Sequence, residues 1–296
     1  MKIVHTFIPS NHDITEEMLD MMLLSVLLVK QYYNNVVLYT NDEICEIVKN
    51  YKIPYTEINT EVLNGVNVKT FSIPKLMVYS VQNEPYIHID LDTFIFDKID
   101  FHNRYTTYST FMEGMDVISN FNAPTFYNAL KGFYKTYIKN SYFISDKLDN
   151  EFVRNISYNQ IPNMSVFGGH KHELIKESSR YCLKIYNDNI DFFDSDYYNA
   201  CVIEQLFIPS AMRMISGENQ HITFLFKGNP NIFNFSNEFL EYPYNVNSNG
   251  DIMYFNDKVD LMSKIDYNFN GFLHLNGYKS TNGISELIKE KINKIK

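Results

Sequence analysis

Short β-rich runs alternate with helical patterns through the first third of the chain, and this order constrains the fold more than any other feature. The runs cover residues 3–8, 36–40 and 86–89, and helical patterns cover 16–32 and 43–50. Strands that alternate with helices are typical of a parallel sheet with crossover helices on its faces. The sequence therefore predicts an α/β fold that is Rossmann-like, with a mostly parallel central sheet flanked by helices.

Boundary signals predict the remaining elements. Asp13 is the expected N-cap of the first helix, with Glu16 three residues later, and Pro74 is expected in the first turn of a helix that continues over 75–81. Further helices are expected over 125–142, 170–186, 196–207 and 284–296, and further strands over 55–58, 116–121, 163–167, 222–226 and 272–275. Gly168 and Gly169 are expected to end the strand over 163–167, and a loop-rich zone is expected over 228–250.

Charge and cysteine content narrow the class of protein. The formal net charge of −9 argues against nucleic-acid binding, which needs a basic face. Cys45, Cys182 and Cys201 lack CxxC spacing and are expected to be reduced thiols. No signal peptide is visible, and the longest apolar stretch, 18–29, is too short for a transmembrane segment. These features predict a cytoplasmic protein and leave its oligomeric state open.

Asp90 and Asp92 form the strongest candidate for a chemical site. They follow the apolar run 86–89, and residues two apart on an extended strand share one face. The carboxyl ends of strands are where α/β sheets usually hold their sites. Two close carboxylates repel unless a cation lies between them, and hard oxygen ligands suit Mn²⁺ or Mg²⁺. Solvated loop acids are the alternative, but the apolar residues 93–96 that follow favour a cation.

Haloacid-dehalogenase phosphatases also carry two Asp residues after an apolar strand. Their motif lies on the first strand and usually has Thr two residues after the second Asp. Here Phe94 occupies that position, and the motif lies near residue 90. The sequence therefore argues against a phosphatase of this class.

The segment 274–279 is the second candidate site. His274 at a strand end can bind a metal, Gly277 allows a phosphate to approach the backbone, and Lys279 can neutralise that phosphate. The alternative is an ordinary strand-end His followed by a turn Gly and a surface Lys.

Together the two motifs resemble those of GT-A-fold glycosyltransferases, especially glycosyltransferase family 8 and related small polysaccharide-synthesising enzymes. The resemblance implies Mn²⁺ (or Mg²⁺) held by Asp90, Asp92 and His274, and a diphosphate bound by Gly277 and Lys279. The family's lysine usually lies one position later and leads into Pro-Trp, whereas Ser-Thr follows Lys279 here. Donor and acceptor identity are therefore not carried over from any characterised member.

The same resemblance extends in chain order over most of the sequence and implies further donor-binding residues. It places the nucleotide base at Thr6 and Ile8, the ribose near Asp90, and a basic residue, Lys75, near the phosphates or the sugar. Lys75 could instead cap or solvate its helix. The segment beneath the sugar is implied to include Asn163, Gly168 and Gly169, although an ordinary strand end is the alternative.

Glu204 and Gln205 are the predicted catalytic residues. On a helix, Glu204 shares a face with Ala200, Cys201 and Ile208, and a carboxylate on an apolar stripe needs a partner. The resemblance implies an acidic or amide residue on a late helix near the reactive carbon, where Glu204 could orient a hydroxyl or act as base or nucleophile. A buried Glu bonded to a helix end is the alternative.

These observations predict a glycosyltransferase that moves a sugar from a nucleoside-diphosphate sugar, with a UDP-sugar favoured, to a hydroxyl acceptor with retention of configuration. The acceptor is a glycan, a lipid-linked molecule or a protein. The expected domain is a single GT-A-like unit over 1–296, with a nucleotide-binding half over 1–121 and an acceptor-side half over 122–296.

Two other classes stay open. A nucleotide-sugar-binding or nucleotidyltransferase-type protein is expected to have a glycine-rich basic loop near its N-terminus, and residues 6–13 show none. A non-catalytic binding protein is expected to have lost one of the three predicted metal ligands, all of which are present.

Overall fold

The computed structural model describes the N-terminal part of the chain almost continuously and the rest in segments. The described residues are 1–9, 14–66, 69–96, 98–99, 101, 104, 107–109, 112–113, 161–195, 199, 201–217, 222–224, 244–246, 252–254, 272–274 and 284–296. The strand predicted over 116–121, the helix predicted over 125–142, and residues Gly277 and Lys279 lie outside them, as does the side chain of His274.

A sheet of seven strands in the order β10-β6-β9-β4-β1-β2-β3 forms the centre of the molecule. Only the pairings of β9 with β4 and β6 are antiparallel, and the other four are parallel. The strands are β1 (Lys2–Thr6), β2 (Val36–Tyr39), β3 (Glu57–Asn59), β4 (Tyr86–Ile89), β6 (Thr107–Ser109), β9 (Val166–Gly169) and β10 (Ile222–Phe224).

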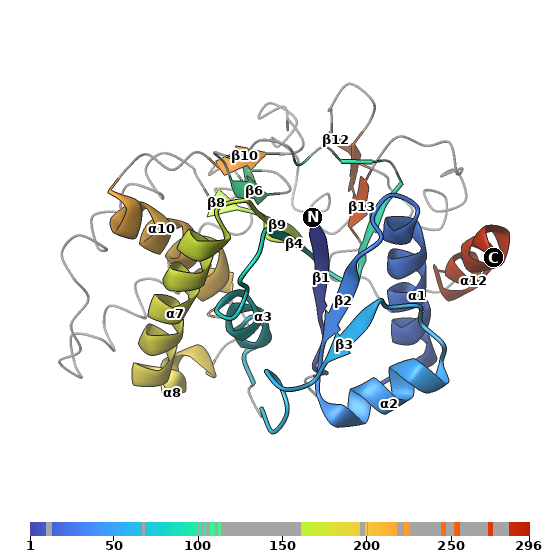
Figure 1. The fold of residues 1–296 in the computed structure, drawn as a ribbon, viewed down its shortest axis with the longest axis horizontal. Helices are drawn as coiled ribbons and strands as arrows, with labels where there is room; N and C mark the ends of the chain where they lie inside the picture. Colours follow the sequence, from blue (N-terminus) through green and yellow to red (C-terminus); the bar gives the residue numbers. More distant parts are fainter. Residues whose placement is uncertain are drawn as a thin grey trace.

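Helices cover both faces of this sheet (Figure 1). One face is covered by α1 (Glu16–Lys30), α2 (Asp42–Asn50) and α12 (Ile284–Ile295). The other is covered by α3 (Ile73–Tyr79), α7 (His172–Asp188), α8 (Ile190–Phe193), the π-helical turn η2 (Val202–Phe207) and α10 (Ile208–Ser216). The predicted α/β class, with a mostly parallel sheet flanked by helices, is confirmed. In the described ranges, no helix is both long and apolar enough to cross a membrane.

Two smaller sheets complete the described structure. A four-stranded sheet has the order β12-β11-β13-β5, and β7 pairs with β8. The strands are β5 (Thr93–Ile95), β7 (Met112–Glu113), β8 (Ile161–Pro162), β11 (Tyr244–Val246), β12 (Ile252–Tyr254) and β13 (Phe272–His274). Strand β11 lies in the zone predicted to be loop-rich, and that prediction is wrong for its three residues. A strand this short shows no alternation in sequence, and here pairing with β12 and β13 defines it.

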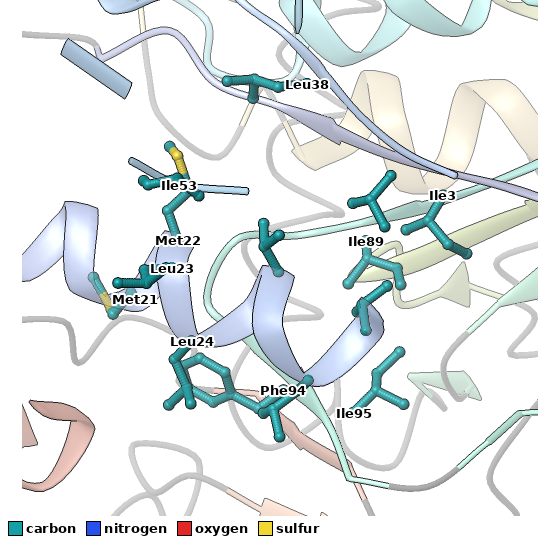
Figure 2. Close-up of a cluster of buried hydrophobic side chains, with 14 of the residues drawn as sticks. Ile3, Met21, Met22, Leu23, Leu24, Leu38, Ile53, Ile89, Phe94 and Ile95 are labelled. Atoms are coloured by element: carbon teal, nitrogen blue, oxygen red, sulfur yellow. The ribbon is translucent and has the colours of Figure 1, made fainter. Parts of the chain in front are cut away.

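Alternating side chains of the central strands divide the core into two layers. Ile3 of β1 faces the α1 side and Val4 faces the α3 side, as the period of a strand requires. Figure 2 shows the α1 side, where Met22 and Leu24 of α1 belong to one buried cluster with Ile3, Ile89 and Phe94. Burial of these apolar side chains from two sheets and a helix holds β5 close to the end of β4, where the candidate site lies.

The N-cap of helix α1 lies two residues after the predicted one. The Oγ1 of Thr15 accepts a hydrogen bond from the Met18 backbone N–H at 3.3 Å, so Thr15 is the N-cap and the prediction of Asp13 is wrong. Glu16 and Glu17 then occupy the first turn, where negative charge favours the helix dipole. Helix α2 has a cap of the same kind, because the Asn41 side chain accepts from the Ile44 N–H at 2.9 Å.

Gly168 lies inside β9 opposite Ile87, so the prediction that the strand stops before Gly168 is wrong, and the strand ends at Gly169 instead. The φ of Gly168 is +144°, and a Cβ at this position would collide with the carbonyl oxygen of Tyr86. We expect Gly168→Ala to lower the free energy of unfolding by about 2–4 kcal/mol, through overpacking and backbone strain. Urea denaturation measures this loss.

Gly65→Ala is the matched control for that substitution. Gly65 also has a positive φ, +74°, but a Cβ there meets no atom within 4 Å. Gly65→Ala should therefore lower the free energy of unfolding only by the cost of the strained backbone, about 1–2 kcal/mol. Equal losses for the two variants would show that the approach of β9 to β4 is not what requires Gly168.

Candidate active site

The carboxyl ends of four parallel strands bring polar residues to one edge of the central sheet. Thr6 ends β1, Thr40 follows β2, Asn59 ends β3 and Asp90 follows β4. The Thr40 hydroxyl donates to the carbonyl of Phe7 at 2.7 Å and ties the first two strand ends together. Ligands of open α/β sheets bind beyond this edge, so it is the candidate active site.

Asp90 and Asp92 belong to a turn at this edge. The Asp90 N–H donates to the Ser165 carbonyl at 2.8 Å, and the Thr93 N–H donates to the Asp90 carbonyl at 3.0 Å. The expectation that both carboxylates share one face of an extended strand is therefore wrong, because the strand ends at Ile89 and the chain turns into β5. Asp92 is buried with 6% of its surface exposed, whereas the Asp90 side chain is 19% exposed.

Strand pairing brings the C-terminal motif to this turn. Strand β13 runs antiparallel to β5, with Phe272 opposite Ile95 and His274 opposite Thr93. The backbone of His274 is thereby placed opposite the residue that follows Asp92. Two segments far apart in the sequence, both predicted to supply metal ligands, meet at one end of a strand pair.

Lys75 contacts the carboxylate of Asp90. Its Nζ lies 2.7 Å from Asp90 Oδ1 and 2.9 Å from Oδ2, and 3.2 Å from Glu204 Oε1. Burial alone would lower the pKa of the Lys75 ammonium, but the charges of Asp90 and Glu204 outweigh burial and raise that pKa above its ordinary value. Lys75 is therefore a fixed positive charge that joins α3, the end of β4 and η2.

Glu204 is held in a π-helical turn and is 3% exposed. Pro209 follows this turn and has no N–H to donate to the Gln205 carbonyl, which removes one α-helical bond and favours the wider turn. The helix predicted over 196–207 is thus η2 in its last six residues. Glu204 faces Lys75 across the site, and the adjacent Gln205 is half-buried with a buried Oε1 that accepts no hydrogen bond from the described residues.

His88 is a site residue that the sequence reasoning missed. It is fully buried on β4, its Nε2 lies 3.2 Å from Thr6 Oγ1, and its Nδ1 lies 3.7 Å from Asp90 Oδ1. Burial, followed by the charge of Lys75, lowers the pKa of His88 well below its ordinary value, so the ring is neutral. The signal was present in the sequence, since His88 interrupts the otherwise apolar and aromatic run 86–89.

Tyr79 is a second missed residue and lies one helical turn after Lys75. Its ring packs edge-on to His88 with centroids 5.3 Å apart. Burial, followed by the charge of Glu204, raises the pKa of its hydroxyl well above the ordinary value. Spacing of four residues on α3 thus aims Lys75 and Tyr79 at the same side of the site.

The other predicted donor-binding residues divide into two groups. Ile8 lies two residues beyond β1 and packs against the α3-side core, and Asn163 is buried near Asp90, where its Oδ1 accepts from the Ser165 N–H at 3.0 Å. Gly168 and Gly169 lie farther away, opposite Ile87 and Tyr86 on the N-terminal part of β4. The structure therefore brings Ile8 and Asn163, but not the two glycines, toward the turn at Asp90.

Of the three predicted metal ligands, the structure describes the side chains of Asp90 and Asp92 but not that of His274. Across these residues, no group of three or more His, Cys, Asp or Glu side chains is arranged to hold a metal ion. The donor types are those that a divalent cation prefers, since Asp90 and Asp92 lie in one turn and the backbone of His274 is paired opposite Thr93.

Comparison with known proteins gives the family of the chain. The model described as "Family of unknown function (DUF6734)" matches residues 1–271, and the chain belongs to this family. None of the curated proteins matches it. Among solved structures, the apo form of mouse xyloside xylosyltransferase 1 is similar over 75% of this chain and 84% of that chain, with 9% identity and a TM-score of 0.35. A likeness at that level supports no conclusion about function.

Proposed function

We propose that the protein is a glycosyltransferase of the GT-A type, which transfers a sugar from a nucleoside-diphosphate sugar to a hydroxyl acceptor. The observation that carries this proposal is the pairing of β5 with β13, which places the backbone of His274 opposite Thr93, beside Asp92. The resemblance of these residues to family 8 favours a UDP-sugar donor and retention of configuration. The acceptor is a glycan, a lipid-linked molecule or a protein.

Asp90, Asp92 and His274 are the proposed ligands of Mn²⁺ or Mg²⁺. When bound, the cation supplies positive charge that stabilises the leaving nucleoside diphosphate. Thr6, Ile8 and Asn163 are proposed to line the donor site, with Gly277 and Lys279 completing its diphosphate end.

Lys75 and Glu204 are proposed to support the same chemistry. The Lys75 ammonium is proposed to face the donor phosphates, where a fixed positive charge favours the leaving group. Glu204 is proposed to hold Lys75 in place, because its buried carboxylate already contacts the ammonium at 3.2 Å. Gln205, whose buried amide oxygen accepts no hydrogen bond from the described residues, is proposed to orient a sugar hydroxyl.

A screen of nucleotide sugars with Mn²⁺ and with chelator tests the proposal. We expect one donor to release its nucleoside diphosphate only when Mn²⁺ is present. Asp92→Asn removes a charge without changing side-chain volume, and we expect it to slow this release by about 100-fold or more, since a catalytic metal supplies several kcal/mol. The product's anomeric configuration, read by NMR, tests retention.

Asp20→Asn is the control for removal of a buried carboxylate. Asp20 is 4% exposed on α1 and accepts from the Tyr51 hydroxyl at 2.6 Å, outside the site. Its variant should retain donor turnover. Turnover that proceeds equally in chelator, or that survives Asp92→Asn, would rule out the metal site, and nucleotide binding without any turnover would favour a nucleotide-sugar-binding protein.

A further inference from the structure

The ammonium of Lys75 contacts the carboxylate of Asp90, which is a proposed ligand of the cation. It contacts both Asp90 oxygens, at 2.7 and 2.9 Å, and Glu204 at 3.2 Å. Its side chain is 13% exposed, so water screens these charges only partly. A divalent cation at Asp90 therefore meets a positive charge on the same carboxylate.

We propose that Lys75 couples the two ligands of the site, so that the divalent cation and the nucleotide diphosphate bind cooperatively. The inference rests on the proposed function, because it takes Asp90 as a cation ligand. Before either ligand binds, Lys75 balances the charge of Asp90 and opposes a cation that arrives without the nucleotide. A bound diphosphate adds negative charge beside Lys75. This charge replaces the attraction of Asp90 for the ammonium, so the Asp90 oxygens become free to bind the cation.

Glu204 makes this exchange feasible without release of a buried charge. Lys75 can move off Asp90 and keep its contact with Glu204, which is fixed in the π-helical turn and 3% exposed. Coupling of this kind is reciprocal, so the cation must tighten nucleotide binding by the same factor as the nucleotide tightens cation binding.

Titration of Mn²⁺ with and without UDP, with free Mn²⁺ read by electron paramagnetic resonance, tests the coupling. We expect UDP to tighten Mn²⁺ binding to the unsubstituted protein about tenfold or more, a usual size for coupling between sites. The double variant Lys75→Met/Glu204→Gln removes one charge of each sign. It should bind Mn²⁺ alone about tenfold more tightly than the unsubstituted protein does, and UDP should tighten Mn²⁺ binding less than it does in the unsubstituted protein.

Lys2→Met/Glu84→Gln is the matched control. This pair, 3.0 Å apart, lies at the start of β1, the opposite edge of the sheet, and its removal is equally charge-neutral. It should leave both affinities unchanged, and circular dichroism checks that each variant is folded. Equal Mn²⁺ affinity, or an equal UDP effect, in the Lys75 double variant and the unsubstituted protein overturns the coupling but leaves the proposed function intact. Absence of both Mn²⁺ and UDP binding from the unsubstituted protein overturns both.

Discussion

Replacement of Lys75 by Met alone should lower the free energy of unfolding by about 3–5 kcal/mol, the usual cost of removing one partner from a buried ion pair. The variant leaves the Glu204 carboxylate, only 3% exposed, without the ammonium that lies 3.2 Å away. It also removes the contact of Lys75 with Asp90, so α3, the end of β4 and η2 lose the positive charge that links them. Urea denaturation of the two proteins at the same pH measures the difference.

The double variant Lys75→Met/Glu204→Gln separates this charge effect from a loss of packing. The neutral amide that replaces the Glu204 carboxylate needs no counter-charge, so we expect most of the lost stability to return, as in other buried pairs replaced as a unit. A double variant as unstable as Lys75→Met would instead show that the lysine's aliphatic stem, and not its charge, stabilises this part of the fold.

The sequence predicted the parallel half of the sheet well because local signals mark each of its elements. The strands over 36–40 and 86–89 are apolar and bounded by polar or helix-breaking residues, and Asn41 and Pro74 mark the starts of α2 and α3. Strand β9 shows where such signals fail. Its two glycines have the composition of a turn, but close packing against Tyr86 keeps them inside the sheet.

The candidate site was predictable as a set of residues and not as a geometry. Asp90 and Asp92 follow a strand as expected, but the turn that separates their environments depends on a hydrogen bond to Ser165, from a distant part of the chain. The position of His274 beside that turn depends likewise on the pairing of β13 with β5. Neither contact can be inferred from the spacing of residues in the sequence.

Glu204 illustrates the same limit for a helix. Helical spacing placed it on an apolar stripe and required a partner for its carboxylate, and the partner is Lys75 on α3. The π-helical turn that aims Glu204 at Lys75 departs from the spacing of 3.6 residues per turn of a regular α-helix. A proline five residues after the carboxylate, Pro209, was the available sequence signal.

His5 should make the protein sensitive to mild acid. It is fully buried on β1, with its Nδ1 2.9 Å from the Tyr55 hydroxyl, and its Nε2 is buried without a hydrogen-bond partner in the described residues. Burial lowers the pKa of His5 from 6.5 to about 3. Between these values the unfolded chain binds a proton that the folded protein does not, so stability falls as the pH falls below 6.5.

The size of this loss follows from the shift in pKa. Each pH unit in the window costs about 1.4 kcal/mol, which gives about 2 kcal/mol by pH 5 and about 5 kcal/mol by pH 3. His88, whose pKa is also lowered by burial, adds a change of the same sign. His5→Gln should therefore remove about 2 kcal/mol of the loss between pH 7 and pH 5 and leave the part due to His88.

Tyr55→Phe is the matched control for His5→Gln. It removes the hydroxyl that contacts His5 but keeps an aromatic ring edge-on to the imidazole, whose centroid lies 5.6 Å from that of Tyr55. This variant should be less stable than the unsubstituted protein at pH 7 and should keep the same dependence on pH. An unchanged pH dependence in His5→Gln, measured by urea denaturation at pH 7, 6 and 5, would mean that other groups cause the acid sensitivity.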